Sequence, residues 1–90
     1  MIPEGASEVD KTIRAILRDV LALPEERTDA MTDTTPLFGT LPELDSMAVA
    51  GVFTELEDRL GIVVEDDEID GDTLETFGAL KTYAVSKVFA

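Results

Sequence analysis

The stretch from Asp45 to Gly61 has the periodicity of one amphipathic helix, with a signal at each end. Counted from Val49, apolar residues recur at steps of three, four, seven and eleven, which places them on one helix face: Val52, Phe53, Leu56 and Leu60. Asp45 is a favoured N-cap residue, and Gly61 suits the left-handed position just past a helix end. The pattern predicts a helix that begins at or beside Ser46 and presents its hydroxyl in the first turn.

A serine in that position has a specific electrostatic environment. Backbone N–H groups in the first turn lack intrahelical partners and the helix dipole is positive there, so a phosphodiester on Ser46 is favoured. The neighbouring Asp45 carboxylate opposes such a group, unless it caps the helix or holds a metal during the modification. On this dipeptide alone a simple helix cap is the commoner explanation, because such residues dominate N-caps.

Two further segments have helical periodicity. The first is expected to begin at Ser7, a candidate cap, and to stop near Ala22, because Pro24 disfavours helical geometry at the residue before it. The last is expected from Thr76, another candidate cap, to Val88. We expect the apolar stripes to share a core made of Leu17, Val20, Phe38, Val52, Phe53, Leu56, Leu60, Leu80 and Tyr83.

The segments between the helices are less regular. Residues 24–44 form a long loop, which is unusual in a small domain unless apolar side chains pin it down, and the candidates are Leu37, Phe38, Leu41 and Leu44. Residues 62–64 could form a short strand, but between helices we interpret them as a buried connector. A short third helix is expected around residues 67–72, with Ile69 and Leu74 turned inward. The chain is therefore predicted to be all-α.

An acidic stretch invites comparison with a calcium loop of the EF-hand kind. Four acids fall at its first, third, fifth and seventh places: Asp66, Glu68, Asp70 and Asp72. The twelfth place, normally a bidentate Glu, is Phe77. We interpret the stretch as a solvated acidic loop and expect no specific metal site. Weak, nonspecific binding of divalent cations by this cluster is the alternative, because so many carboxylates repel one another.

Composition limits the class of function. Ninety residues suit one domain, which we expect at 7–90 after a flexible N-terminus at 1–6. Twenty acidic against seven basic residues give a net charge of −13, which argues against nucleic-acid binding and favours partners with basic patches. No histidine or cysteine is available for a nucleophile pair or a usual zinc site, so we expect no enzyme.

The sequence also bears on location. The N-terminus has neither a basic start nor an apolar stretch, so no signal peptide is expected. No run approaches the roughly 18–20 apolar residues of a membrane span. A cysteine-free chain is compatible with a reducing compartment, and we expect a cytoplasmic protein.

Taken together, these features resemble the acyl carrier protein family. The resemblance rests on Asp45-Ser46-Met47 at the start of the helix and on Leu56-Glu57-Asp58-Arg59-Leu60-Gly61-Ile62 at its end, and it extends over roughly residues 9–88. It implies a small four-helix bundle of acyl-carrier type with a long first loop and a short third helix. It also implies 4′-phosphopantetheine attached to Ser46, with Asp45 as the adjacent cap and a recognition residue for a phosphopantetheinyl transferase. The cofactor supplies the thiol that the chain lacks.

The function implied is that of an acyl or aminoacyl carrier, which shuttles a thioester between enzymes of a lipid, polyketide or related biosynthetic pathway. Its expected partners, besides the transferase, are acyl-transferring or ligase enzymes with basic or apolar docking patches, and the carrier is expected to be a monomer. The candidate partner-binding residues are Met47, Val49, Glu55 and Asp58.

The start of the central helix departs from the carriers of fatty acid synthesis, which have acids on its exposed face. This chain has Ala48, Val49 and Gly51 there. We therefore expect an apolar docking face with an acidic margin, and a partner outside the housekeeping fatty-acid machinery. The alternative is that small residues merely allow close helix packing.

A second class of function stays open at this point. The chain could be an unmodified small helical interaction module, with calcium bound at the 66–72 acidic stretch, because a fold does not fix a function. The two hypotheses differ in whether Ser46 is modified.

Overall fold

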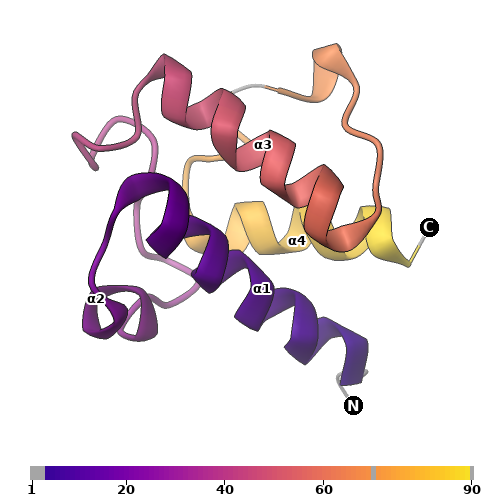
Figure 1. Ribbon diagram of the computed structural model, residues 1–90, viewed down its shortest axis with the longest axis horizontal. Coiled ribbons are helices and arrows are strands. Elements are labelled where there is room, and N and C mark those ends of the chain that lie inside the picture. Colours follow the sequence, from indigo (N-terminus) through magenta and orange to yellow (C-terminus); the bar gives the residue numbers. More distant parts are fainter. Residues whose placement is uncertain (1–3, 70, 90) are drawn as a thin grey trace.

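Helix α1 (Glu4–Leu21) lies against the two other long helices, α3 (Ser46–Leu60) and α4 (Phe77–Val88), in the computed structural model (Figure 1). A short helix, α2 (Glu25–Asp29), follows α1, and a 3-10 helix, η1 (Asp66–Glu68), lies between α3 and α4. The structure describes residues 4–69 and 71–89, and within them we find no strand and no helix long and apolar enough to cross a membrane. The all-α prediction is confirmed.

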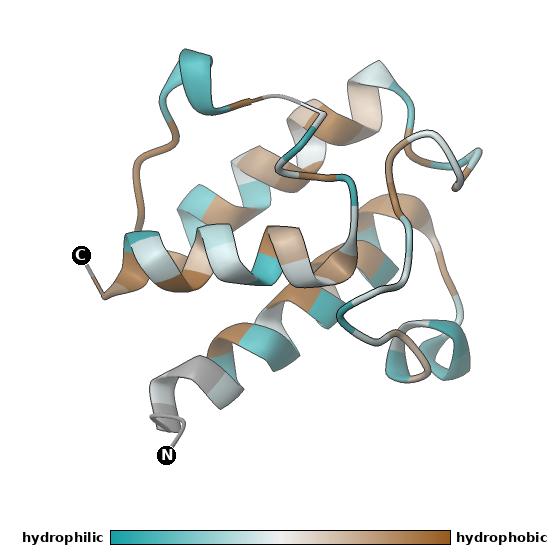
Figure 2. Ribbon diagram, turned by 180° about the vertical axis from the view of Figure 1, so that it is seen from behind, coloured by the Kyte–Doolittle hydropathy of each residue, from teal (hydrophilic) through white to brown (hydrophobic). Residues whose placement is uncertain are grey.

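The core fills the space between α1, α3 and α4. Of the nine residues predicted for it, five are buried: Leu17, Val52, Phe53, Leu56 and Leu80. Val20, Leu60 and Tyr83 are half-buried and pack against that core. Figure 2 shows that hydrophilic residues are concentrated instead on η1 and α2, which flank the three long helices.

Helix α1 begins at Glu4, so the predicted start at Ser7 is three residues too late. Residues 1–3 lie outside the described residues, but residues 4–6, expected in a flexible N-terminus, are helical. The predicted end is confirmed, because the helix stops at Leu21. The next residue, Ala22, has a positive φ of 56° and turns the chain toward Pro24.

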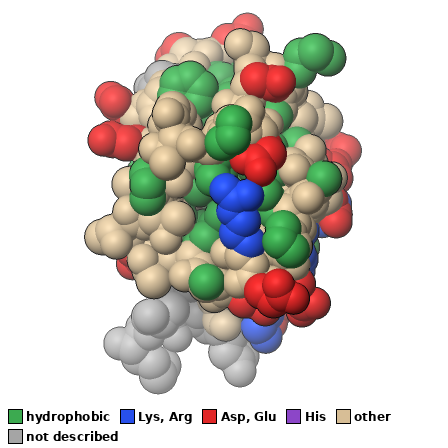
Figure 3. Space-filling view, turned by 90° about the vertical axis from the view of Figure 1, so that its left-hand side faces the viewer, with side chains coloured by type: hydrophobic (Ala, Val, Ile, Leu, Met, Phe, Trp, Pro, Cys, Tyr) green, Lys and Arg blue, Asp and Glu red, His purple; other side chains and the backbone are tan. Residues whose placement is uncertain are grey.

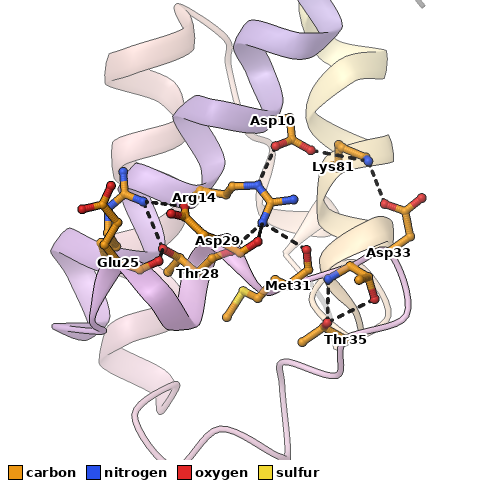
Figure 4. A network of polar contacts seen from close by, with 11 residues as sticks. Asp10, Arg14, Glu25, Thr28, Asp29, Met31, Asp33, Thr35 and Lys81 are labelled. Carbon is orange, nitrogen blue, oxygen red and sulfur yellow. Dashed lines mark hydrogen bonds and ion pairs between the residues drawn. The ribbon is translucent and has the colours of Figure 1, made fainter.

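Helix α2 lies within residues 24–44, which we expected to be an irregular loop. Its five residues are too few for a periodic signal in the sequence. Neighbouring side chains of α1 support it. Arg14 Nη1 donates to the carbonyls of Thr28 and Met31, and Arg18 Nη1 donates to Thr28 Oγ1 at 3.0 Å (Figure 4). Tertiary contacts therefore stabilise α2.

Three of the four apolar residues expected to pin the long loop do so. Leu37, Leu41 and Leu44 are buried, but Phe38 is 47% exposed, so its assignment to the core is wrong. The amides of Leu37 and Phe38 bond to the carbonyls of Glu75 and Leu74, next to an isolated antiparallel bridge between Pro36 and Thr76. Phe38 lies in the turn at residues 38–40 that directly follows Leu37, and its side chain faces outward there.

The segment after α3 alternates between inward and outward side chains. Ile62 is buried and Val64 half-buried, whereas Val63 is 64% exposed, so the buried connector is correct except at Val63. A short third helix is present, but it lies earlier than the predicted residues 67–72, of which residue 70 is outside the described residues. Residues 66–68 form η1, which a capping box between Glu65 and Glu68 stabilises. Leu74 is buried as expected, but Ile69 is 40% exposed.

Candidate functional site

Ser46 is the first residue of α3, and it is exposed. The preceding Asp45 is the N-cap, as predicted: its Oδ1 accepts a hydrogen bond from Ala48 N at 2.9 Å, and its carbonyl accepts one from Val49 N at 2.9 Å. Ser46 follows this cap directly, so it stands in the first turn of α3, at the positive end of the helix dipole, and it is open to solvent.

A cavity of about 210 Å³ opens directly beside this serine. Its walls come from the first loop, from α3 and from the segment between η1 and α4, and it is lined by Phe38, Ser46, Val49, Ile69, Gly71 and Leu74. Its volume is below the roughly 300–1,000 Å³ of pockets for drug-sized ligands, so it accommodates a short chain or part of a longer one.

The cavity explains two of the incorrect core assignments. Phe38 and Ile69 are partly exposed because they line this opening beside Ser46. We did not predict them as site residues. No local signal in the sequence separates Phe38 from its buried neighbour Leu37, because both are large apolar residues in an irregular segment.

The four candidate partner residues lie in different environments. Met47, next to Ser46, is 85% exposed, and Asp58 is exposed near the far end of α3. Val49 is half-buried and lines the cavity. Glu55 is about 14 Å further along the helix axis than Ser46. The structure therefore brings Met47 and Val49 close to the serine, and separates the two acids from it.

The acidic margin of α3 is partly neutralised. Arg59 Nη2 lies 2.8 Å from Glu55 Oε1 and 2.7 Å from Asp19 Oδ2 of α1. The hydrogen bond with Asp19, followed by that with Glu55, raises the pKa of Arg59. The Glu55 carboxylate is thus already engaged within the molecule.

The small residues at the start of α3 have a packing role. Ala48 is partly buried against the core. A Cβ on Gly51 would lie 3.2 Å from Val20 Cγ1 of α1, which is closer than an ordinary contact. Gly51 therefore permits α1 and α3 to approach each other, and this position supports the packing alternative. Met47 provides the exposed apolar surface.

The face of α2 and the first loop has apolar side chains interspersed with acidic and basic ones (Figure 3). A second cavity, of about 290 Å³, lies there between Arg27, Met31, Pro36 and Leu41. Arg27 Nη1 is 2.9 Å from Glu43 Oε2, which ties α2 to the residues just before Ser46. The Glu43 backbone amide and then Arg27 lower the pKa of the Glu43 carboxyl.

The acidic stretch contributes contacts within the fold. Glu68 Oε1 accepts from Glu65 N and Lys87 Nζ, both at 2.9 Å, and the Glu65 hydrogen bond is the larger cause of a lowered Glu68 pKa. Asp66 and Asp72 are exposed, and Asp70 lies outside the described residues. In the part of the chain that the structure describes, no three His, Cys, Asp or Glu residues are arranged to hold a metal ion.

Comparison with known proteins adds two findings. A family model described as a phosphopantetheine attachment site matches residues 11–83, which include Ser46 and the whole cavity. The fold is similar to the solution NMR structure of a holo acyl carrier protein from Nitrosomonas europaea, with a TM-score of 0.81 and 43% identity. That similarity covers 91% of this chain and 96% of the other. No curated protein matches the sequence.

Proposed function

Because the chain belongs to the acyl carrier family, whose cofactor is a covalently attached 4′-phosphopantetheine, we propose that Ser46 is the attachment residue. We further propose that the protein shuttles an acyl or aminoacyl group, held as a thioester, between enzymes of a lipid, polyketide or related biosynthetic pathway. The bound group supplies a thiol, which a chain without cysteine cannot provide.

The observation that carries this proposal is the placement of Ser46. Its hydroxyl is exposed at the first turn of α3, where unpaired backbone amides and the helix dipole favour a phosphodiester. The cavity beside it is lined mainly by apolar side chains, which suit the near part of an arm or a short acyl chain. The Asp45 carboxylate is engaged by its bond to Ala48 N, and Ser46 beside it is exposed.

The remaining residues have supporting roles in this proposal. Asp45 fixes the start of α3 and contributes to recognition by a phosphopantetheinyl transferase. Acyl carrier proteins are carriers rather than catalysts, and this chain has no histidine and no cysteine, so we propose that it is no enzyme. We propose a cytoplasmic monomer with one carrier domain that includes the whole of α1.

For the enzymes that exchange the thioester, we propose docking on Met47 and the cavity rim. Met47 is 85% exposed, so a partner with an apolar patch buries it, and basic residues around that patch meet the acids of a chain with net charge −13. Val49 and Asp58 contribute at the edges, and Glu55 contributes less because Arg59 engages it. A survey with fatty-acid synthase enzymes tests this proposal. If these enzymes accept this chain as readily as they accept their own carrier, the proposed apolar docking face is wrong.

The attachment itself is tested by incubation with coenzyme A and a broad-specificity phosphopantetheinyl transferase, followed by intact mass. We expect the wild type to gain the mass of the arm and Ser46→Ala to gain nothing. Ser7→Ala and Ser86→Ala are matched controls, because Ser7 and Ser86 are also exposed helical serines. A gain that persists in Ser46→Ala, or no gain with several transferases, contradicts the proposal.

A further inference from the structure

Backbone hydrogen bonds join residues 33–38 of the first loop to residues 74–78 at the start of α4, and we call this pairing the loop ladder. The bonds, each 2.9 Å, run from the amides of Gly78, Phe77, Leu37 and Phe38 to the carbonyls of Asp33, Thr35, Glu75 and Leu74, respectively. An antiparallel bridge pairs Pro36 with Thr76 between them.

One end of the loop ladder is part of the site. Phe38 and Leu74, its last pair, both line the cavity beside Ser46. The ladder also leads into the turns before that serine: the Leu37 carbonyl accepts from Leu41 N at 2.9 Å, and the Leu41 carbonyl accepts from Leu44 N at 3.1 Å. The position of the ladder therefore bears on the cavity wall and on the chain that enters α3.

The other end of the loop ladder packs tightly against α4. A Cβ on Gly78 would lie 2.6 Å from the Asp33 carbonyl oxygen, a separation at which the backbone has to move. Lys81 Nζ lies 2.7 Å from Asp33 Oδ1 and 3.6 Å from Asp10 Oδ2 (Figure 4). Asp33 is thus held through its backbone by Gly78 and through its side chain by Lys81.

We infer that Gly78, Asp33 and Lys81 are positioning residues for Ser46 and its cavity. They set how closely the loop ladder lies on α4, and the ladder transmits that position to Phe38 and, through the turns, to Ser46. The loading measurement that tests this inference rests on the proposed attachment at Ser46. Because a misplacement of about 1 Å can cost roughly 100-fold in rate, a small shift of the ladder is measurable.

The test compares Gly78→Ala and Lys81→Met with Thr82→Ala, an exposed position of α4 that likewise gains helix propensity. We expect kcat for loading of Ser46 by the transferase to fall by up to about tenfold in Gly78→Ala and in Lys81→Met. This loss is smaller than the roughly 100-fold loss for a misplacement of about 1 Å, because the expected shift of the ladder is smaller. KM for the carrier stays near its wild-type value, because Met47 remains exposed. Lys81→Arg keeps the ion pair with Asp33 and restores kcat.

NMR of the unmodified protein gives an independent readout. We expect the amide resonances of Phe38 and Gly71 to shift in Gly78→Ala and to stay in place in Thr82→Ala. If they stay in place in Gly78→Ala, or if that variant loads at the Thr82→Ala rate, the inference is wrong. If Gly78→Ala does not fold, Lys81→Met decides by the same two measurements. Absence of any loading in the wild type contradicts the proposed attachment alone, because the NMR comparison does not require the cofactor.

Discussion

The guanidinium of Arg14 in α1 lies over the ring of Phe77 in α4, with 4.5 Å between its Cζ and the ring centroid. Its Nε donates to Asp10 Oδ1 at 2.6 Å, and Nη1 donates to the Met31 carbonyl at 3.0 Å. One side chain therefore connects α1, α4 and the chain just after α2.

Replacing Arg14 tests how much this connection stabilises the fold. Arg14→Met retains much of the aliphatic stem but removes the cation over Phe77 and the donors to the carbonyls after α2. We expect the free energy of unfolding in urea to fall by about 3 kcal/mol. Lys11→Met is the control, because Lys11 is 72% exposed in its side chain, and its effect should stay within about 0.5 kcal/mol. Equal losses in the two variants would contradict the role of Arg14.

Two substitutions separate the capping role of Asp45 from its role in recognition. Asp45→Ala removes the acceptor for Ala48 N and should cost about 1 kcal/mol of stability. Asp45→Asn keeps a good N-cap and should be nearly as stable as the wild type. If the transferase recognises the carboxylate, both variants load more slowly, as measured by intact mass over time. If Asp45→Asn loads at the wild-type rate, Asp45 acts only as a helix cap.

A pair of phenylalanines tests the assignment of core and cavity wall. Phe53 is 3% exposed and meets the Tyr83 ring edge to face, with centroids 6.0 Å apart. Phe53→Ala should therefore lower the free energy of unfolding by about 3–5 kcal/mol. Phe38 is 47% exposed, so Phe38→Ala should cost less than about 1.5 kcal/mol. Urea unfolding of both variants checks the order, and a larger loss for Phe38→Ala would place Phe38 in the core.

Tyr83 predicts how stability depends on alkaline pH. Burial, followed by the charge of nearby Glu68, raises the pKa of the Tyr83 hydroxyl to about 12, against about 10 in an unfolded chain. The folded state holds this proton more tightly than the unfolded chain does. The resulting contribution of Tyr83 to the free energy of unfolding is therefore fully present below about pH 10 and is lost as pH rises toward about 12. The urea midpoint of the wild type should fall over that window. Tyr83→Phe should show a shallower fall, and equal slopes would contradict the assignment.

The elements that could be predicted have local signals. For α3, the cap at Asp45, the apolar stripe and Gly61 with a positive φ of 66° agree with one another, and the helix follows the prediction. Thr76 likewise caps α4 as expected, through Ala79 N. Each of these features depends on residues within four positions of one another, and the sequence displays those residues directly.

The elements that could not be predicted depend on distant contacts. Helix α2 is supported by Arg14 and Arg18 from another helix, and nothing within its five residues indicates this. The outward Phe38 depends on pairing with Leu74, which is 36 residues away in the sequence. For the same reason Ser46 was found from its cap and helix, while the cavity wall beside it was not.

Ala22, just after α1, adopts the left-handed backbone conformation that L-residues enter only at a cost of roughly 1–2 kcal/mol. Glycine enters it freely, although its unfolded chain has more freedom to lose. Ala22→Gly should therefore raise the free energy of unfolding by about 0.5–1 kcal/mol. This turn takes no part in presenting the serine. Protein engineers can therefore use Ala22→Gly to raise the thermostability of the scaffold.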